Sequence, residues 1–192
     1  MKSSGIKTST VLASFLLAAC LSMHAEVKLP AIFSDGMVMQ QQTNANLWGM
    51  ATPNKKVTVT TGWNGKQYAV TADKNGSWKL SVSTPEAGGP YTITFDDGTP
   101  KTLNNILIGE LWLCSGQSNM EMPMKGFKNQ PVENANMDIL RSKNPHIRLF
   151  TVKRTSTITP QNDVVGSWKE AAPVSVRDFS ATAYYFGRLV NE

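Results

Sequence analysis

Cysteine is nearly absent from this chain of 192 residues, which contains only Cys20 and Cys114. We therefore expect no structural disulfide. Cys114 would have no partner, and a buried free thiol is the simplest interpretation of it. A strong excess of charge is also lacking, because the net charge is +5 and the basic residues are scattered. This distribution argues against a nucleic-acid partner. No internal apolar run approaches the ~18 residues that a membrane span needs.

The first 25 residues have the composition of an export signal. Lys2 and Lys7 precede a short apolar core, Val11–Ala19, which is too short to span a membrane. Two processing sites compete. Cleavage after Ala25 would give a periplasmic or secreted soluble protein, whereas Leu17-Ala18-Ala19-Cys20 resembles a bacterial lipobox and would leave a lipid anchor on that cysteine. We expect an exported protein, with both modes of processing open.

Short segments rich in β-branched and aromatic residues follow one another up to residue 104. Turn sequences separate them, and several alternate with period two. Asn64-Gly65 and Asn75-Gly76 are expected to form tight hairpins, because both residue types tolerate positive φ. A strand about every ten residues is typical of a β-sandwich. The predicted strands cover residues 46–49, 57–60, 67–70, 77–82 and 91–95.

The pattern changes after Asn105. Residues 106–113 form a nearly continuous apolar run, as expected for a strand covered on both faces. A helix over residues 132–142 and a strand over 146–152 follow. Residues 179–190 predict a second helix, whose apolar positions are Phe179, Ala183, Phe186 and Val190. This order is typical of the beginning of an α/β layer with a parallel sheet.

Ser118 is the candidate catalytic residue, in the turn Ser115-Gly116-Gln117-Ser118-Asn119 after the apolar run. A serine at the carboxyl end of a buried strand and at a helix start lies in the field of free N–H groups. Its own N–H could stabilise an oxyanion, and the amides of Gln117 and Asn119 could fix the loop. The alternative is that these residues only cap a helix. Met120 also stands where a Gly-x-Ser-x-Gly elbow has its second glycine.

Gly116-Gln117-Ser118-Asn119-Met120, preceded by Gly109–Ser115, closely resembles the first block of SGNH hydrolases, in the sialate O-acetylesterase family. Val27–Gln40, Trp168-Lys169 and Phe179–Arg188 are similar to further segments of that family. The resemblance implies a multidomain α+β protein, in which an all-β sandwich precedes an SGNH-type α/β/α domain that is incomplete here. The predicted divisions are a signal peptide over 1–25, a β-sandwich domain over 26–104 and the N-terminal part of the SGNH domain over 105–192.

The resemblance also implies an activity, the removal of O-acetyl groups from sialic acid or related sugars through a serine acyl-enzyme. It implies no metal and no organic cofactor. Ser118 matches the nucleophile, and Gln117 and Asn119 shape its loop as substrate-binding residues. Ser180 falls near the second block of the family, so its N–H is a further substrate-binding candidate. A helix-start role explains Ser180 about as well.

A serine nucleophile needs a base, which the family takes from a downstream Asp-x-x-His block. Outside the export signal this chain has only His146, with Lys143 three residues before it, and we interpret His146 as structural. We therefore expect a truncated chain that is inactive in isolation and exposes apolar surface. The alternative is a non-catalytic module that binds glycans or another domain.

Three weaker patterns have two interpretations each. Met120, Met122 and Met124 could bind a soft metal, although packing beneath the loop is favoured. Asp96-Asp97 is interpreted as a turn rather than a calcium site. The sandwich tryptophans could stack on sugars or fill the core, and the core is the commoner place; they are Trp48, Trp63 and Trp78.

Overall fold

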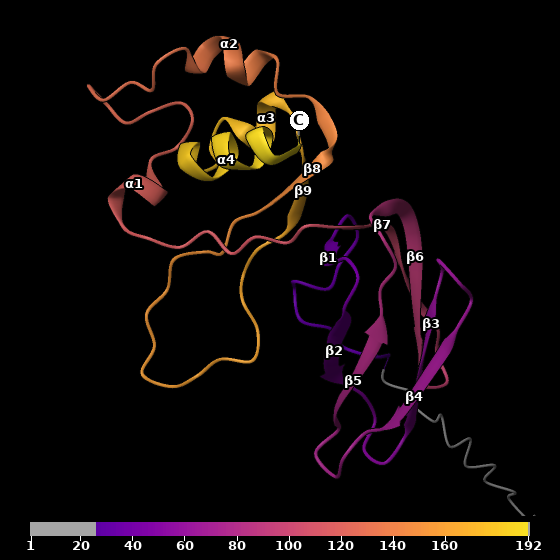
Figure 1. Ribbon diagram of the computed structural model, residues 1–192. Coiled ribbons are helices and arrows are strands. Elements are labelled where there is room, and N and C mark those ends of the chain that lie inside the picture. The colour runs from indigo at the N-terminus through magenta and orange to yellow at the C-terminus, as the bar shows by residue number, and fades with distance from the viewer. Residues whose placement is uncertain (1–25, 192) are drawn as a thin grey trace, which may run out of the picture.

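The computed structural model describes residues 26–191. The predicted export signal and the lipobox cysteine Cys20 lie outside these residues. The described chain has a mixed α+β fold, with most strands at one end and the helices at the other (Figure 1). No helix within it is long and apolar enough to cross a membrane.

Two sheets enclose the core of the strand-rich end. The five-stranded sheet has the order β1-β7-β6-β3-β4, and the smaller sheet pairs β2 with β5. All pairs are antiparallel except β1 with β7. The predicted strands are confirmed; the observed bounds are β1 Val38–Gln40, β2 Asn44–Met50, β3 Lys56–Thr61, β4 Gln67–Thr71, β5 Ser77–Ser83, β6 Gly88–Asp96 and β7 Lys101–Gly109.

Alternation along the strands builds the core. In β3, Val57 and Val59 are fully buried between less buried threonines. Trp78 of the small sheet is 4% exposed, and its ring lies 5.9 Å from that of Phe95 in the large sheet. Its prediction as a core residue is confirmed. Burial of one such apolar side chain stabilises the fold by about 1.5–3 kcal/mol. Trp48 is 36% exposed, so the sandwich tryptophans do not share one environment.

The two predicted hairpins have different outcomes. Asn64-Gly65 joins β3 to its antiparallel neighbour β4, with Gly65 at φ +67°, and is confirmed. Asn75-Gly76 joins β4 to β5, which belong to different sheets, so the hairpin expected there was wrong. Asp73 explains the difference, because its Oδ1 accepts the N–H groups of both Asn75 and Ser77 and turns the chain across the sandwich.

The strand expected over residues 106–113 was wrong in its bounds and its surroundings. Ile106 and Ile108 lie in β7 and point into the sandwich core, where they are at most 3% exposed. The chain then leaves the sheet at Gly109, and Leu113 is 93% exposed. The apolar run over residues 106–113 thus consists of the end of β7, where buried and less buried residues alternate, and an exposed segment after it. The domain boundary predicted between residues 104 and 105 falls inside β7, and the division into domains stays a prediction.

The second part of the chain contains the helices and one small sheet. Its elements are α1 Ser118–Glu121, α2 Ala135–Leu140, β8 Asn144–Phe150, β9 Trp168–Ala171, α3 Pro173–Val176 and α4 Ala181–Asn191. β8 pairs antiparallel with β9, so the expected parallel sheet does not form among residues 26–191. A second core includes Met124, Leu149, Val176 and Tyr184.

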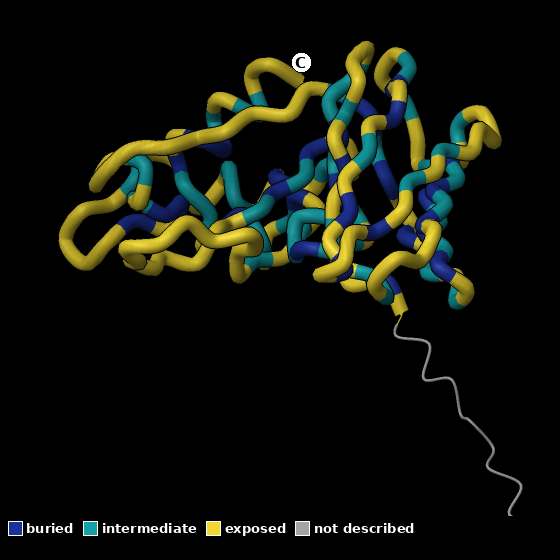
Figure 2. Tube along the Cα trace, turned by 90° about the horizontal axis from the view of Figure 1, so that it is seen from below, coloured by how far each residue is buried: buried dark blue, intermediate teal, exposed yellow. Residues whose placement is uncertain are grey.

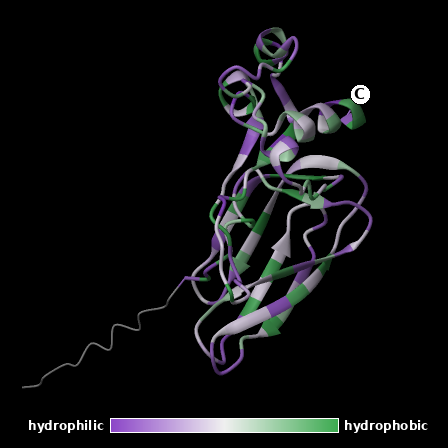
Figure 3. Cartoon of the chain, turned by 90° about the vertical axis from the view of Figure 1, so that its left-hand side faces the viewer, coloured by the Kyte–Doolittle hydropathy of each residue, from purple (hydrophilic) through white to green (hydrophobic). Residues whose placement is uncertain are grey.

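The apolar face expected on α4 was only partly right. Ala183 is buried, but the other fully covered side chains of the helix are Ala181 and Tyr184. Phe186 and Val190 are 38% and 52% exposed. The last turn of α4, beside the C label in Figure 3, is hydrophobic and uncovered within the described chain. The expected exposed apolar surface is therefore present.

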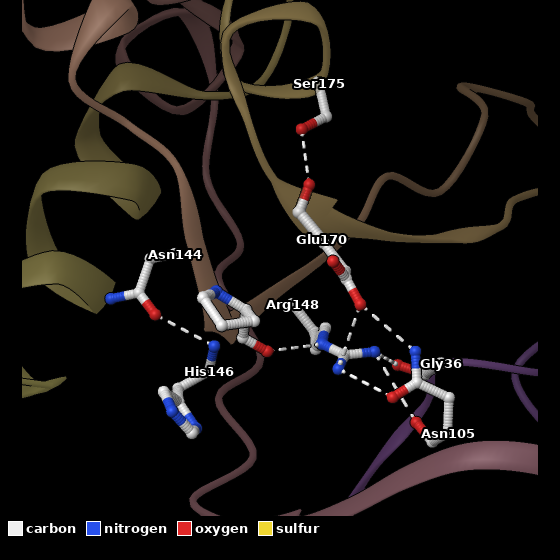
Figure 4. Close-up of polar contacts among 8 residues, drawn as sticks. Gly36, Asn105, Asn144, His146, Arg148, Glu170 and Ser175 are labelled. Carbon is white, nitrogen blue, oxygen red and sulfur yellow. Dashed lines mark hydrogen bonds and ion pairs between the residues drawn. The ribbon is translucent and has the colours of Figure 1, made fainter. Parts of the chain in front are cut away.

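Arg148 joins the two parts of the fold (Figure 4). This side chain of β8 is 3% exposed and lies 3.3 Å from the carboxylate of Glu170 in β9. Its guanidinium donates to the carbonyl oxygens of Pro145 and Gly36 at 2.9 and 3.2 Å, and to Asn105 Oδ1 at 3.0 Å. Burial lowers the pKa of the Arg148 guanidinium, and Glu170 opposes that shift. One buried cation thus fixes the helical part on β7 and on the segment before β1.

A smaller polar cluster joins α2 to α4. Asp138 accepts from the Tyr185 hydroxyl at 2.7 Å and from Arg188 at 2.8 Å. The Tyr185 hydrogen bond and Arg188 hold the pKa of the Asp138 carboxyl below its usual value. Burial, followed by the Asp138 hydrogen bond, raises the pKa of Tyr185 to about 12.

Replacement of Asp138 by asparagine is expected to make stability less sensitive to acid. A lowered folded-state pKa contributes stability above the unfolded-state value, and this stability is lost as pH falls through the folded value. The thermal midpoint of Asp138→Asn should therefore lie below that of the wild type at pH 7, and the gap should narrow below about pH 4. Thermal unfolding followed by circular dichroism measures this. The matched control is Glu133→Gln, an exposed carboxyl just before α2; an equal narrowing there would contradict the assignment.

Candidate functional site

Ser118 is the first residue of α1, and its side chain is exposed. The preceding residue, Gln117, is the N-cap and makes no side-chain capping bond. Among residues 26–191, neither Ser118 Oγ nor its backbone N–H has a hydrogen-bond partner. Simple helix capping therefore does not account for this serine. Its hydroxyl and N–H are both open to a reacting ester.

The start of α4 holds the turn that carries Ser118. Thr182 Oγ1 donates to the Asn119 carbonyl at 3.1 Å, and the Ala181 N–H donates to the Met122 carbonyl at 2.8 Å. Ser180 Oγ lies 3.3 Å from Met120 Sδ. Two segments about 60 residues apart in sequence, those of Ser118 and Ser180, thus lie side by side.

Ser180 has a local role in the structure. Its Oγ accepts the N–H of Ala183 at 3.3 Å, which is the bond that an N-cap serine makes with the first turn of its helix. The helix-start interpretation is confirmed. A contribution of the Ser180 N–H to an oxyanion site stays a prediction.

The side chains of Gln117 and Asn119 are exposed and form no hydrogen bond within the described part of the chain. No hydrogen bond of these side chains fixes the loop there, and the backbone carbonyl of Asn119 accepts from Thr182 instead. Their role as substrate-binding residues stays a prediction. Gly116 packs closely, because a Cβ there would lie 3.1 Å from Met120 Cβ. Met124 is fully buried in the second core, which confirms packing for that methionine.

His146 lies at the wrong place to activate Ser118. Its backbone N–H donates to Asn144 Oδ1. The side chain of Asn144 in turn donates to Asn191 at the last turn of α4. The turn of Ser118 contacts Thr182 at the opposite end of that helix. Nine residues at 1.5 Å each separate the two contacts by about 14 Å. The structural interpretation of His146 agrees with this position.

The buried thiol expected at Cys114 was wrong, because Cys114 is exposed. It lies in the uncovered segment after β7, where burial would require packing that residues 26–191 do not supply. Two residues earlier, Trp112 is 56% exposed, and its ring forms an edge contact with Phe186 at 5.0 Å. This edge contact joins the segment to the exposed face of α4.

One charged pair at the helix of Ser118 was not predicted from the sequence. Arg154 Nη1 lies 3.1 Å from Glu121 Oε1, and Glu121 ends the helix that Ser118 begins. Arg154 comes from the loop between β8 and β9, 33 residues away in sequence. No local motif signals a contact of that separation.

Within the described residues, no three His, Cys, Asp or Glu side chains form a cluster that could hold a metal ion. Asp96 Oδ1 accepts the Gly98 N–H at 2.8 Å, so the turn interpretation of this segment is confirmed. Asp97 is 5% exposed, and its carboxylate oxygens have no partner within residues 26–191.

Comparison with solved structures places this fold in a class of enzymes. A carbohydrate acetylesterase from Xanthomonas citri superposes with a TM-score of 0.79 and 30% sequence identity, over 86% of this chain and 37% of that one. The fold of this chain therefore resembles part of a carbohydrate acetylesterase. A scan of protein-family models finds no match.

Curated proteins of one name are also similar to this chain. Sialate O-acetylesterase of Mus musculus is 30% identical over 91% of this chain and 35% of its own length. The human protein of that name is 26% identical over 84% of this chain and 34% of its own length. The resemblance to the sialate O-acetylesterase family, predicted from the motifs, is thus confirmed. The chain spans about a third of the length of these relatives.

Proposed function

We propose that this protein is a carbohydrate esterase that removes O-acetyl groups from sialic acid or related acetylated sugars. One observation carries the proposal: Ser118 begins α1 with an exposed hydroxyl that has no partner among residues 26–191, and its turn contacts the start of α4. The similarity of most of the chain to acetylesterases supports the same substrate chemistry.

Ser118 Oγ would attack the carbonyl carbon of the acetyl ester. A base takes the serine proton, the bond from the acetyl carbon to the sugar oxygen breaks, and that oxygen leaves with a proton as a hydroxyl. Water then releases acetate from the acetyl-serine. The backbone N–H of Ser118, which has no partner among residues 26–191, would stabilise the negative charge on the carbonyl oxygen. A donor of this kind contributes roughly 3 kcal/mol to transition-state binding.

The base is proposed to come from outside residues 26–191, in an SGNH-type domain that this chain begins. Two observations support that. His146 lies at the far end of α4, and the curated relatives are about three times as long as the matched region. The chain alone is then inactive. Export to the periplasm or the medium, with a lipid anchor at Cys20 as the alternative, belongs to the same proposal.

Release of acetate from O-acetylated N-acetylneuraminic acid by the complete gene product tests the function. We expect turnover by the complete protein and none by residues 26–192. If the complete protein releases no acetate but binds the glycan, the non-catalytic module becomes the better description. Half-exposed Trp48 is then the first residue to replace in a binding assay.

A further inference from the structure

The loop between β8 and β9 is exposed yet anchored. It covers residues 151–167 and forms the wide orange loop of Figure 1, and all of it except Gly166 is exposed. The Lys153 N–H donates to the Val165 carbonyl at 2.8 Å and closes the neck of the loop. Asp163 Oδ1 accepts the N–H of Ala31 at 2.8 Å. Long exposed stretches of this kind stand out in Figure 2.

A third anchor joins this loop to the helix of the candidate nucleophile. Arg154 Nη1 lies 3.1 and 3.4 Å from the two carboxylate oxygens of Glu121. Glu121 follows Ser118 by three residues within α1, and positions three apart lie on one face of a helix. The ion pair therefore holds the Arg154 guanidinium at the single helical turn that Ser118 begins.

The Arg154–Glu121 pair is weakly held. The Arg154 side chain is 87% exposed and that of Glu121 is 51% exposed. Ion pairs this exposed contribute little to stability, because water and salt screen them. Another carboxylate can therefore replace Glu121 at small cost. Lys125, in the connection between α1 and α2, is already paired with Asp178 at 2.6 Å.

The remainder of the loop suits a sugar. Hydroxyl and amide groups gather at its tip, where Thr157, Thr159 and Gln161 form hydrogen bonds with one another. A guanidinium binds a carboxylate through a planar pair of donors. A sialic acid is a sugar with one carboxylate, so a cation beside the nucleophile and a hydroxyl-rich loop match its two kinds of polar group.

We propose that Arg154 is a specificity-determining residue, which binds the carboxylate of an acidic acetylated sugar while Ser118 attacks its ester. Glu121 occupies the guanidinium until substrate displaces it. The inference rests on the proposed esterase function and deepens it, because it selects acidic sugars over neutral acetylated ones.

Two esters of different charge test the assignment on the complete protein. Arg154→Gln should lower kcat/KM about tenfold for O-acetylated N-acetylneuraminic acid, and leave 4-nitrophenyl acetate within about twofold. Arg154→Lys should restore part of the loss. Glu121→Gln should act in the opposite direction and lower KM for the acidic ester. The matched control is Arg177→Gln, an exposed arginine without an ion pair among residues 26–191.

Binding of free N-acetylneuraminic acid, followed by calorimetry, tests the anion site without turnover. The dissociation constant should rise about tenfold in Arg154→Gln and stay unchanged in Arg177→Gln. Equal effects on the acidic and the neutral ester, or binding that does not depend on Arg154, would overturn the assignment. Failure to release acetate from either ester would overturn the esterase proposal instead, and the binding result would still decide the role of Arg154.

Discussion

Replacement of Ser118 by alanine should lower the rate of acetate release from O-acetylated sialic acid at least about a thousandfold in the complete protein. In the proposed mechanism the Ser118 hydroxyl forms the covalent bond to the acetyl group, so no neighbouring group can supply its role. Acetate release over time, with substrate in excess, measures the loss. Residual activity within tenfold of the wild type would reject Ser118 as the nucleophile.

The same substitution should leave stability nearly unchanged. Ser118 Oγ is exposed and makes no hydrogen bond within residues 26–191, so alanine should change the free energy of unfolding by less than about 0.5 kcal/mol. Ser115→Ala is the matched control, because it removes a hydroxyl from the same exposed turn. Equal losses of activity in the two variants would indicate a disturbed loop and not a missing nucleophile.

Replacement of Arg148 by methionine is expected to have the largest effect on stability. Methionine fills similar space but donates no hydrogen bond. The carbonyl oxygens of Gly36 and Pro145 and the side-chain oxygen of Asn105 therefore lose their donor. These acceptors are exposed or partly buried, so water can replace part of what they lose, and we expect a decrease of about 2 kcal/mol in the free energy of unfolding. Urea denaturation measures it.

Charge alone should not rescue this position. Arg148→Lys should remain destabilised, because one ammonium cannot reach all the partners that the planar guanidinium contacts. Arg177→Met, at an exposed arginine, should change stability by less than about 0.5 kcal/mol. A change below 1 kcal/mol in Arg148→Met would mean that other contacts suffice to join the two parts of the fold.

Sandwich strands could be predicted because their signal is local. In β3 the alternation of Val57 and Val59 with threonine is visible without any knowledge of the partner strand. The run after Asn105 was misread for a related reason. Ile106 and Ile108 face the core, and the intervening Leu107 is also apolar, so composition hides the period of two. The covered face of α4 depends on packing around Tyr184, which no helical spacing reveals.

In the candidate site, too, local features could be predicted and contacts between distant residues could not. The Ser118 turn carries a contiguous motif, and its helix start was predicted correctly. Arg154 and Glu121 are 33 residues apart, and Arg148 and Gly36 are 112 apart, so neither contact leaves a sequence pattern. The side chains of Gln117 and Asn119 show the reverse error, because residues with suitable chemistry in a motif do not hold the loop.

The contacts around residues 31–36 also set an order of assembly. This segment precedes β1 and contacts Asn104 of β7, but three of its polar partners come late in the chain: Arg148 donates to Gly36, Asp163 accepts from Ala31, and Trp168 donates to Ile32. A chain that emerges from the ribosome N-terminus first can complete the strand pairing of the sandwich once β7 is made. Residues 31–36 then lack these three contacts through about sixty further residues of synthesis, until β9 is made. Three contacts of a segment made early therefore wait for residues made much later.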